Sequence, residues 1–148
     1  MIRSAVAVWK GSPVVGEGLV STTSGVISNA LYAGAGSVTS EEPCTTPSEM
    51  LAAAVASCTS LMLARETART GVKPDQVKTE AVVSVEQKKG QWEVTKIEVH
   101  VTASLPDVDE EEFHKICRNA KKHCLISRSL NVPIFMTSKL ETHDAVTV

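Results

Sequence analysis

The sequence has few aromatic residues and no long apolar run. Phenylalanine, tyrosine and tryptophan together make up 3% of the 148 residues, so a core must be built from aliphatic side chains. No apolar run approaches the roughly 20 residues that span a bilayer. The N-terminal segment reaches Lys10 before the apolar part of a signal peptide is complete. We therefore expect a cytoplasmic protein without a membrane-spanning segment.

An excess of charge of either sign is also absent. The formal net charge is −2, and the sequence has neither a basic stripe nor an acidic tail, which argues against a nucleic-acid partner. Hydrophobic residues make up 43% of the chain and charged residues 22%, as in ordinary globular proteins. The length suits one domain of common size, so we expect a single domain over residues 1–148.

The four cysteines, Cys44, Cys58, Cys117 and Cys124, include no C-x-x-C pair. Structural zinc sites usually show two close pairs of ligands, so the spacing predicts no metal site. Stable disulfides are rare in cytoplasmic proteins. The thiols therefore need another explanation.

The local patterns predict strands first and then a long helix. Residues 5–10 and 13–22 read as a hairpin, and a short extended piece and a loop follow within 25–44. The clearest signal is Thr46–Pro47–Ser48–Glu49, a capping box with proline at the first helical position. The helix that follows should end near Thr70, before Gly71.

The second half predicts a hairpin, a helix and a final strand. Residues 77–87 and 92–104 alternate apolar with polar side chains, which is typical of a hairpin with one solvated face; His100 falls on that face. A second helix should open at Pro106 and Asp107, and residues 133–147 should close the chain as a strand. Strands grouped around two helices predict an α+β fold rather than a parallel α/β sheet.

The helical periodicity places two cysteines on apolar faces. In the first helix one face carries Leu51, Ala54, Val55, Cys58, Leu61, Met62 and Arg65. In the second helix one stripe carries Phe113, Ile116, Cys117, Ala120 and Cys124. Packing of these faces would bring the thiols of Cys58 and Cys124 close together. A buried thiol packs like a small hydrophobe, and burial raises its pKa, so a reactive Cys58 would need a nearby cation. Filler and reactive roles both remain open at this point.

Four segments together resemble one known family. They are TTPSEMLAAAVASCTSLML and AKKHCLISRSL, which hold Cys58 and Cys124, with GLVSTTSGV and VTKIEVHVTASLPDVDEEEF. Their order, with the two cysteines 66 positions apart, is similar to the OsmC/Ohr family of thiol-dependent hydroperoxide reductases, and closer to its OsmC branch.

This resemblance implies an interwoven homodimer in which antiparallel sheets wrap two central helices. It implies that the Cys58 thiolate attacks an organic hydroperoxide, releases an alcohol and becomes a sulfenic acid. Cys124 would then form a disulfide with Cys58, and a dithiol reductant, for which a lipoyl-type group is one candidate, would restore both thiols. No metal or organic cofactor is required. The implied biological role is antioxidant defence.

Glu49 matches the glutamate of the family pattern. It lies nine residues before Cys58, which in a helix is about 13.5 Å along the axis and about 180° around it. We therefore expect Glu49 to reach a Cys58 site only across the dimer interface. The capping box alone is the alternative explanation for this residue.

The sequence departs from the family in one important place. The family supplies an arginine from the N-terminal hairpin or the next loop, but no arginine lies between Arg3 and Arg65 here. Lys10, Arg65 and Arg128 are the possible substitutes. Leu125 also stands where the family has proline after the second cysteine. The departure favours a second hypothesis, a hydrophobic-ligand-binding or redox-sensing protein with little turnover, and a third is a structural dimer with inert thiols.

Overall fold

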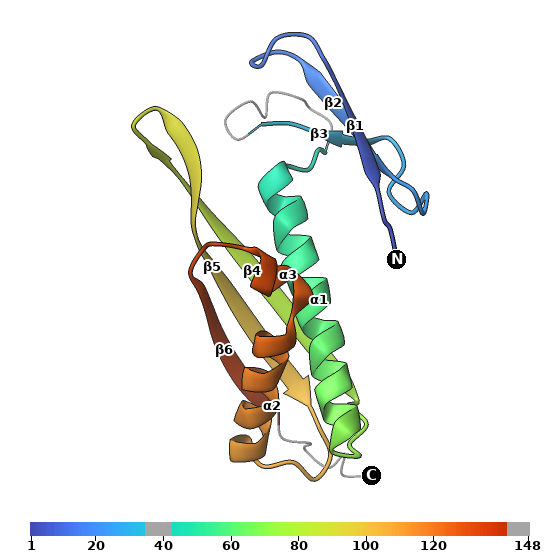
Figure 1. The fold of residues 1–148 in the computed structure, drawn as a ribbon, viewed down its shortest axis with the longest axis vertical. Coiled ribbons are helices and arrows are strands. Elements are labelled where there is room, and N and C mark those ends of the chain that lie inside the picture. The colour runs from blue at the N-terminus through green and yellow to red at the C-terminus, as the bar shows by residue number, and fades with distance from the viewer. Residues whose placement is uncertain (35–42, 142–148) are drawn as a thin grey trace. The chain divides into compact units, whose positions relative to one another are not determined.

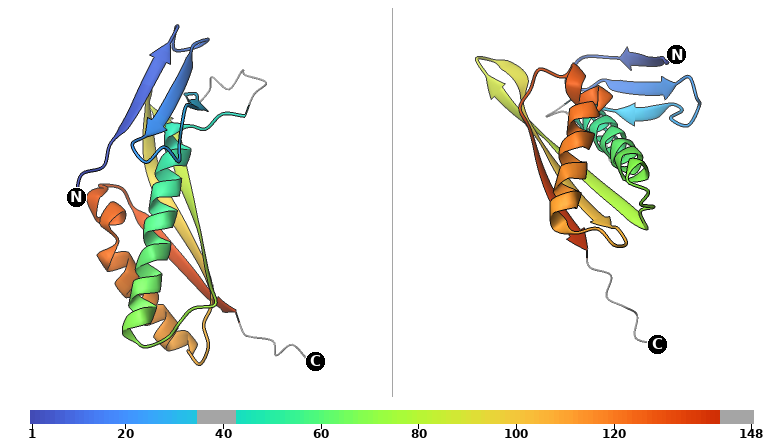
Figure 2. Two further views of the ribbon diagram at one scale, coloured as in Figure 1. Left: turned by 90° about the vertical axis from the view of Figure 1, so that its right-hand side faces the viewer. Right: turned by 60° about the horizontal axis from the view of Figure 1, so that its bottom comes forward.

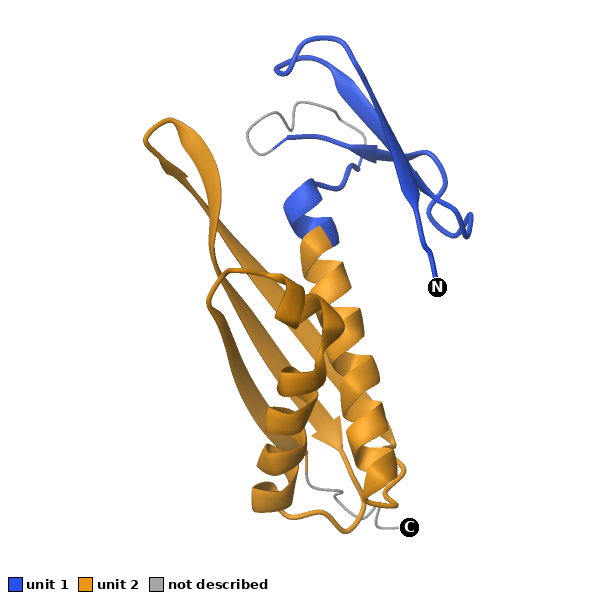
Figure 3. Cartoon of the chain, in the orientation of Figure 1, with its two compact units in different colours: residues 1–50 blue, residues 51–148 orange. Residues whose placement is uncertain are grey.

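The computed structural model of the chain describes residues 1–34 and 43–141. The chain divides into two compact units, Met1–Met50 and Leu51–Val148 (Figure 3). The division falls within the first turn of the long helix. The prediction of a single domain over residues 1–148 stays a prediction. The ends of two predicted segments, 25–44 and 133–147, fall partly outside the described residues.

The first unit is a small antiparallel sheet with the strand order β1-β2-β3 (Figure 1). Its strands are β1 (Ala5–Lys10), β2 (Glu17–Thr22) and β3 (Ala30–Tyr32). The predicted strand at 13–22 begins later, at Glu17. The Gly16 amide donates a hydrogen bond to the Ser12 carbonyl, which closes a turn and leaves residues 13–16 outside the ladder.

Gly18 lets two aromatic rings meet in this sheet. Trp9 on β1 and Tyr32 on β3 have ring centroids 5.7 Å apart. Gly18 lies opposite both residues on the intervening strand β2. A Cβ at Gly18 would lie 2.4 Å from the Tyr32 ring, so any larger residue would separate the strands.

Helix α1 (Pro47–Arg69) follows the predicted bounds closely. The Glu49 amide donates to Thr46 Oγ1, as a capped N-terminus requires. At the other end Gly71 has φ +78°, and the Val72 amide bonds the Thr67 carbonyl. Gly71 therefore ends the helix as predicted.

By length and mean hydropathy, 1.3, α1 could cross a bilayer, contrary to the expectation that no apolar segment is long enough. Its residues Val55, Met62 and Leu63 instead belong to the buried core of the second unit. We therefore assign α1 as a core helix and not as a membrane span.

The sheet of the second unit has the order β4-β5-β6, with β4 (Gln76–Lys88), β5 (Gln91–Ser104) and β6 (Ile134–Glu141). Lys89 and Gly90, at φ +50° and +81°, form the two-residue turn of the predicted hairpin. His100 on β5 is exposed and hydrogen-bonds Thr137, as expected of the solvated face.

The prediction that the sheets are antiparallel is wrong for β6, which pairs with β5 in parallel. The reason is the connection between them. Helices α2 (Glu110–His123) and α3 (Leu125–Ser129) carry the chain back along the sheet, so β6 starts at the same end as β5. The α+β assignment holds, with one antiparallel and one mixed sheet.

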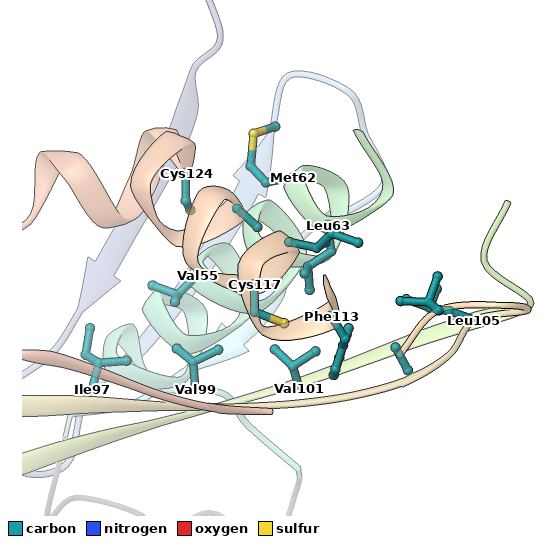
Figure 4. Close-up of a cluster of buried hydrophobic side chains, with 14 residues drawn as sticks. Val55, Met62, Leu63, Ile97, Val99, Val101, Leu105, Phe113, Cys117 and Cys124 are labelled. Carbon is teal, nitrogen blue, oxygen red and sulfur yellow. The ribbon is translucent and has the colours of Figure 1, made fainter. Parts of the chain in front are cut away.

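Helices α1 and α2 cover one face of this sheet (Figures 1 and 2). The helix-facing side chains of β5, Ile97, Val99 and Val101, are buried beneath them (Figure 4). The stripe from Phe113 to Cys124 is buried as predicted. Helix α2 begins later than Pro106, because Asp109 accepts a hydrogen bond from the Glu112 amide and is the N-cap.

The buried face of α1 differs from the predicted face by about one residue around the helix. Leu61 and Arg65 are exposed and Cys58 is half-buried, so Cys58 lies at the edge of the buried stripe and not at its centre. The prediction used the helical periodicity of apolar residues alone. The buried face is instead set by the side from which the sheet and α2 contact α1. The residues that are buried are Val55, Thr59, Met62, Leu63, Glu66 and Thr67.

Candidate active site

Two thiols from different elements meet in the second unit. Cys58 comes from the middle of α1, and Cys124 is the residue between α2 and α3. The two side chains interact, because each influences the pKa of the other. Cys124 has no exposed surface, whereas Cys58 is half-buried. The fold therefore brings together the two cysteines that the sequence singled out, with Cys58 the more accessible.

Cys124 is surrounded by hydrogen-bond donors. Burial alone would raise the pKa of Cys124, but hydrogen bonds outweigh it and the pKa is lowered. The groups that lower it are Ser127, Cys58 and Thr59, whose hydroxyl oxygen lies 4.0 Å from the sulfur. The Ser127 amide makes no full capping bond to the sulfur, so it acts mainly as a dipole.

Cys58 has the opposite electrostatics. Burial raises the pKa of Cys58, and the neighbouring Cys124 raises it further. The backbone amides of Ile126 and Leu125 hydrogen-bond the Cys58 sulfur and oppose this effect only in part.

Within residues 51–141, neither arginine among the possible substitutes acts on Cys58. Arg65 and Arg128 are both exposed on their helices. The charge that bears on the Cys58 sulfur is that of Cys124. Lys10 ends β1 in the other unit and is also exposed. The described part of the second unit thus places no guanidinium on the thiol pair, and a role for Lys10 stays a proposal.

Glu49 lies in the first turn of α1 and is exposed. Its carboxylate accepts a hydrogen bond from Thr45 Oγ1 at 2.7 Å, and its amide donates to Thr46. These contacts are local to the helix start. Its predicted role at a Cys58 site therefore stays a proposal.

Glu66 is a buried charge that the sequence analysis missed. Its side chain is 7% exposed and accepts hydrogen bonds from Arg69 Nη1 at 2.8 Å and His123 Nδ1 at 3.1 Å. The His123 contact joins α2 to α1 one residue before Cys124. Glu66 also lines a cleft of about 580 Å³ whose other walls include Arg69, Glu112 and Arg118. This cleft is charged and does not include the thiols.

Thr59 and Ser127 were also missed, although the sequence holds a signal for Ser127. Cys124 begins a Cys-x-x-Ser sequence, and the third residue after a helix N-cap is placed to face the cap. Thr59 has no comparable signal. Its contact with Cys124 depends on how α1 packs against the α2–α3 junction.

The remaining cysteines are less suited to chemistry. Cys117 is buried on α2, and burial raises its pKa to about 11. Cys44 is half-buried before α1. Among the described residues no group of three or more histidine, cysteine or acidic side chains could hold a metal ion.

Comparison with known proteins places the whole arrangement in one family. Residues 39–139 match the model of the OsmC-like protein family. The chain is 32% identical over 140 residues to the peroxiredoxin OsmC of Escherichia coli strain K12, covering 95% of this chain and 97% of that protein.

Solved structures share the fold at lower identity. An OsmC-like protein of unknown function from Vibrio cholerae has a TM-score of 0.76 and 18% identity, over 94% of this chain and 99% of that one. The organic hydroperoxide resistance protein OhrB of Bacillus subtilis has a TM-score of 0.68 and 18% identity, over 93% and 98%. The α+β fold with two sheets and central helices is therefore the OsmC-like fold, and the chain belongs to the OsmC family.

Proposed function

We propose that the protein is a thiol peroxidase that reduces organic hydroperoxides to alcohols through Cys58 and Cys124. The observation that carries the proposal is that the fold brings these two thiols, from positions 66 residues apart, into interaction with each other. Similarity to peroxiredoxin OsmC supports the same chemistry. The half-buried Cys58, which packs against the apolar core, is the thiol that a hydrophobic peroxide can reach.

The proposed cycle has two chemical steps before reduction. The Cys58 sulfur attacks the terminal oxygen of the hydroperoxide, the O–O bond breaks, and the alcohol leaves. Cys58 becomes a sulfenic acid, the reversible first stage of thiol oxidation. The Cys124 sulfur then attacks the Cys58 sulfur, and the S–O bond breaks to release water as the disulfide forms. A dithiol, such as a dihydrolipoyl group, returns both residues to thiols.

We also propose that two single-domain subunits assemble as a homodimer in the cytoplasm. Leu61 on α1 and Leu125 on α3 are 51% and 68% exposed in the single chain, although they flank the thiol-bearing residues. A second copy would cover such apolar surface. In that dimer Glu49 would serve the Cys58 site of the other subunit. A monomeric mass at micromolar concentration would contradict this arrangement.

The test uses cumene hydroperoxide with dihydrolipoamide or dithiothreitol as the reductant. Alcohol formation and free-thiol counts should show repeated turnover by the wild-type protein. Cys58→Ser and Cys124→Ser should both abolish turnover, and Cys117→Ser is the matched control that should retain it. Stoichiometric oxidation of the wild-type protein without turnover would contradict the peroxidase.

A second function is favoured by the raised pKa of Cys58, on which no cation acts among residues 51–141. A thiol that ionises with difficulty suits a redox sensor or a protein that binds a hydrophobic ligand more than a fast peroxidase. Slow oxidation by cumene hydroperoxide, without turnover when dihydrolipoamide is added, would favour this function.

A further inference from the structure

A run of cations without a carboxylate begins after the first turn of α2. Residues 113–140 include no aspartate or glutamate, and their lysines and arginines are Lys115, Arg118, Lys121, Lys122, Arg128 and Lys139. Six positive charges in a chain of net charge −2 leave a net charge of −8 for all other residues. Whether these cations converge in space decides if the segment can recognise an anion.

Four of these cations line one groove where α2, α3 and the start of β6 meet. Its volume is about 440 Å³, and the cations are Arg118, Lys121, Lys122 and Arg128. Its other lining residues are Ser127, Val132 and Ile134. All four cations are exposed, and within residues 51–141 none of them forms an ion pair with a carboxylate. The groove therefore presents convergent positive charge to solvent.

The groove lies beside the thiol pair. Lys122 precedes Cys124 by two residues, and the Arg128 amide donates a hydrogen bond to the Cys124 carbonyl at 3.0 Å. Ser127 lines the groove and also interacts with the Cys124 side chain. A molecule seated in the groove is thus held next to the two residues that the proposed cycle oxidises.

We propose that this groove is the docking surface for the reductant, an acidic protein that carries a dithiol on a flexible arm. This role rests on the proposed function, which forms the disulfide that the partner reduces. Cys124 has no exposed surface and Cys58 is half-buried, so Cys58 is the sulfur that the partner can reach. Because Cys58 does not line the groove, the dithiol has to extend from the docked body on an arm.

The reduction needs no reactant beyond the dithiol. One thiolate of the partner attacks the Cys58 sulfur, the S–S bond breaks, and Cys124 leaves as a thiolate that takes a proton. The partner's second sulfur then attacks its first sulfur and releases Cys58, which also takes a proton. The partner loses two electrons and two protons, and the cysteine pair gains them. Nearby cations favour the attack because they attract the acidic partner and stabilise its thiolate.

The surroundings of the groove favour an acidic protein over other anions. None of the described residues that line it is aromatic, so the bases of a nucleic acid have no ring to stack on. A second copy docked by the same face would place its cations against these ones. Arg118 and Lys122 are about 6 Å apart along α2, and Arg128 lies on the next helix. Several carboxylates match this spread better than one does.

The experiment measures reduction of a disulfide that is formed without peroxide. Protein is oxidised with diamide, and peptide mass confirms the Cys58–Cys124 bond. Two reductants are compared, a glutamate-rich peptide ending in two cysteines and the same peptide with glutamine at every glutamate. Their rates with hydroxyethyl disulfide, which is neutral, correct for intrinsic thiol reactivity. We expect the acidic peptide to react about tenfold faster at low salt. The difference should vanish near about 0.5 M sodium chloride, which screens exposed charges.

Arg118→Gln/Lys122→Gln removes two charges from the groove. It keeps Lys121, whose ammonium donates a hydrogen bond to the Ile134 carbonyl at 2.6 Å. The variant should slow the acidic peptide about tenfold at low salt and change the rate with the glutamine peptide by less than about twofold. The salt dependence of the wild-type protein tests the same point without any substitution.

Lys78→Gln/Lys88→Gln is the matched control. Both lysines are exposed on β4 and do not line the groove, and their replacement changes the net charge by the same amount. The control should keep the full preference for the acidic peptide. Equal losses in the two variants would contradict docking in the groove, because net charge alone would then explain the preference.

Other results would also overturn the proposal. Equal corrected rates for the two peptides with the wild-type protein at low salt would show that charge does not guide the reductant. Loss of a dimeric mass in Arg118→Gln/Lys122→Gln would assign the groove to a second copy. Loss of binding to a single-stranded oligonucleotide in that variant, with unchanged peptide rates, would assign the groove to nucleic acid.

The docking surface and the proposed function fail in different ways. If diamide-oxidised protein prefers the acidic peptide but the reduced protein does not turn over cumene hydroperoxide, only the peroxidase is contradicted. If cumene hydroperoxide is turned over with dithiothreitol but the two peptides react alike, only the docking surface is contradicted. A protein in which diamide forms no Cys58–Cys124 bond would contradict both.

Discussion

Oxidation of the Cys58–Cys124 pair should stabilise the folded protein measurably. The two side chains already interact within the second unit, so we expect the bond to form without a change of fold. The cysteines are 66 positions apart. Closing a loop of that length lowers the entropy of the unfolded chain, which corresponds to about 4 kcal/mol of stabilisation as an upper estimate.

The assay is thermal unfolding of reduced and peroxide-treated protein at one fixed concentration, since association also shifts the midpoint. For a chain of this size each kcal/mol shifts Tm by roughly 2–4 °C, so oxidation should raise Tm by on the order of 10 °C. Cys58→Ser treated in the same way should show no rise. An unchanged Tm in a wild-type sample whose Cys58–Cys124 bond is proven by peptide mass would refute the reasoning. A bond to Cys117 would refute the pairing.

The remaining predictions concern stability and thiol protection. Phe113→Ala should cost about 3–5 kcal/mol in denaturant unfolding, because its side chain is 1% exposed in the core. Asp109→Ala should cost about 1 kcal/mol in the free energy of unfolding, since it removes the N-cap bond to the Glu112 amide; an unchanged free energy of unfolding would contradict this. Because burial raises the pKa of Cys117 to about 11, its neutral thiol favours the folded state, and that contribution should be lost as pH rises from about 9 to about 11. Cys117→Ala should reduce this pH-dependent loss of stability. In the wild-type protein, iodoacetamide at about pH 8 should leave Cys117 unmodified until the protein unfolds.

Local signals predicted the elements well where the chemistry is local. The Thr46–Glu49 cap and Gly71 set the ends of α1 because capping bonds and positive φ involve only neighbouring residues. The start of α2 was misplaced, since proline and aspartate at 106 and 107 also suit the turn that precedes the true cap at Asp109. The alternation in β4 and β5 fixed the buried face of the sheet for the same local reason.

Predictions that depended on packing direction were less accurate. The helical periodicity of α1 placed Cys58 at the centre of the predicted buried face, but the sheet and α2 contact the helix from a neighbouring side. The direction of β6 was also wrong, because strand direction depends on where the connecting helices return the chain. Burial of Glu66 depends on Arg69 and His123, and the second of these partners lies 57 residues away.

The sequence by itself determined the family, the two thiols and the absence of an arginine near the first of them. Residue types and spacings along one chain are enough for such conclusions. Only the tertiary structure decided that Cys58 lies beside Cys124 and which of the two thiols stays accessible. That depends on how α1 packs against the α2–α3 junction, where Cys124 is buried and Cys58 is half-buried. Hydrogen bonds and burial depend on distances in space, which residue spacing along the chain does not specify.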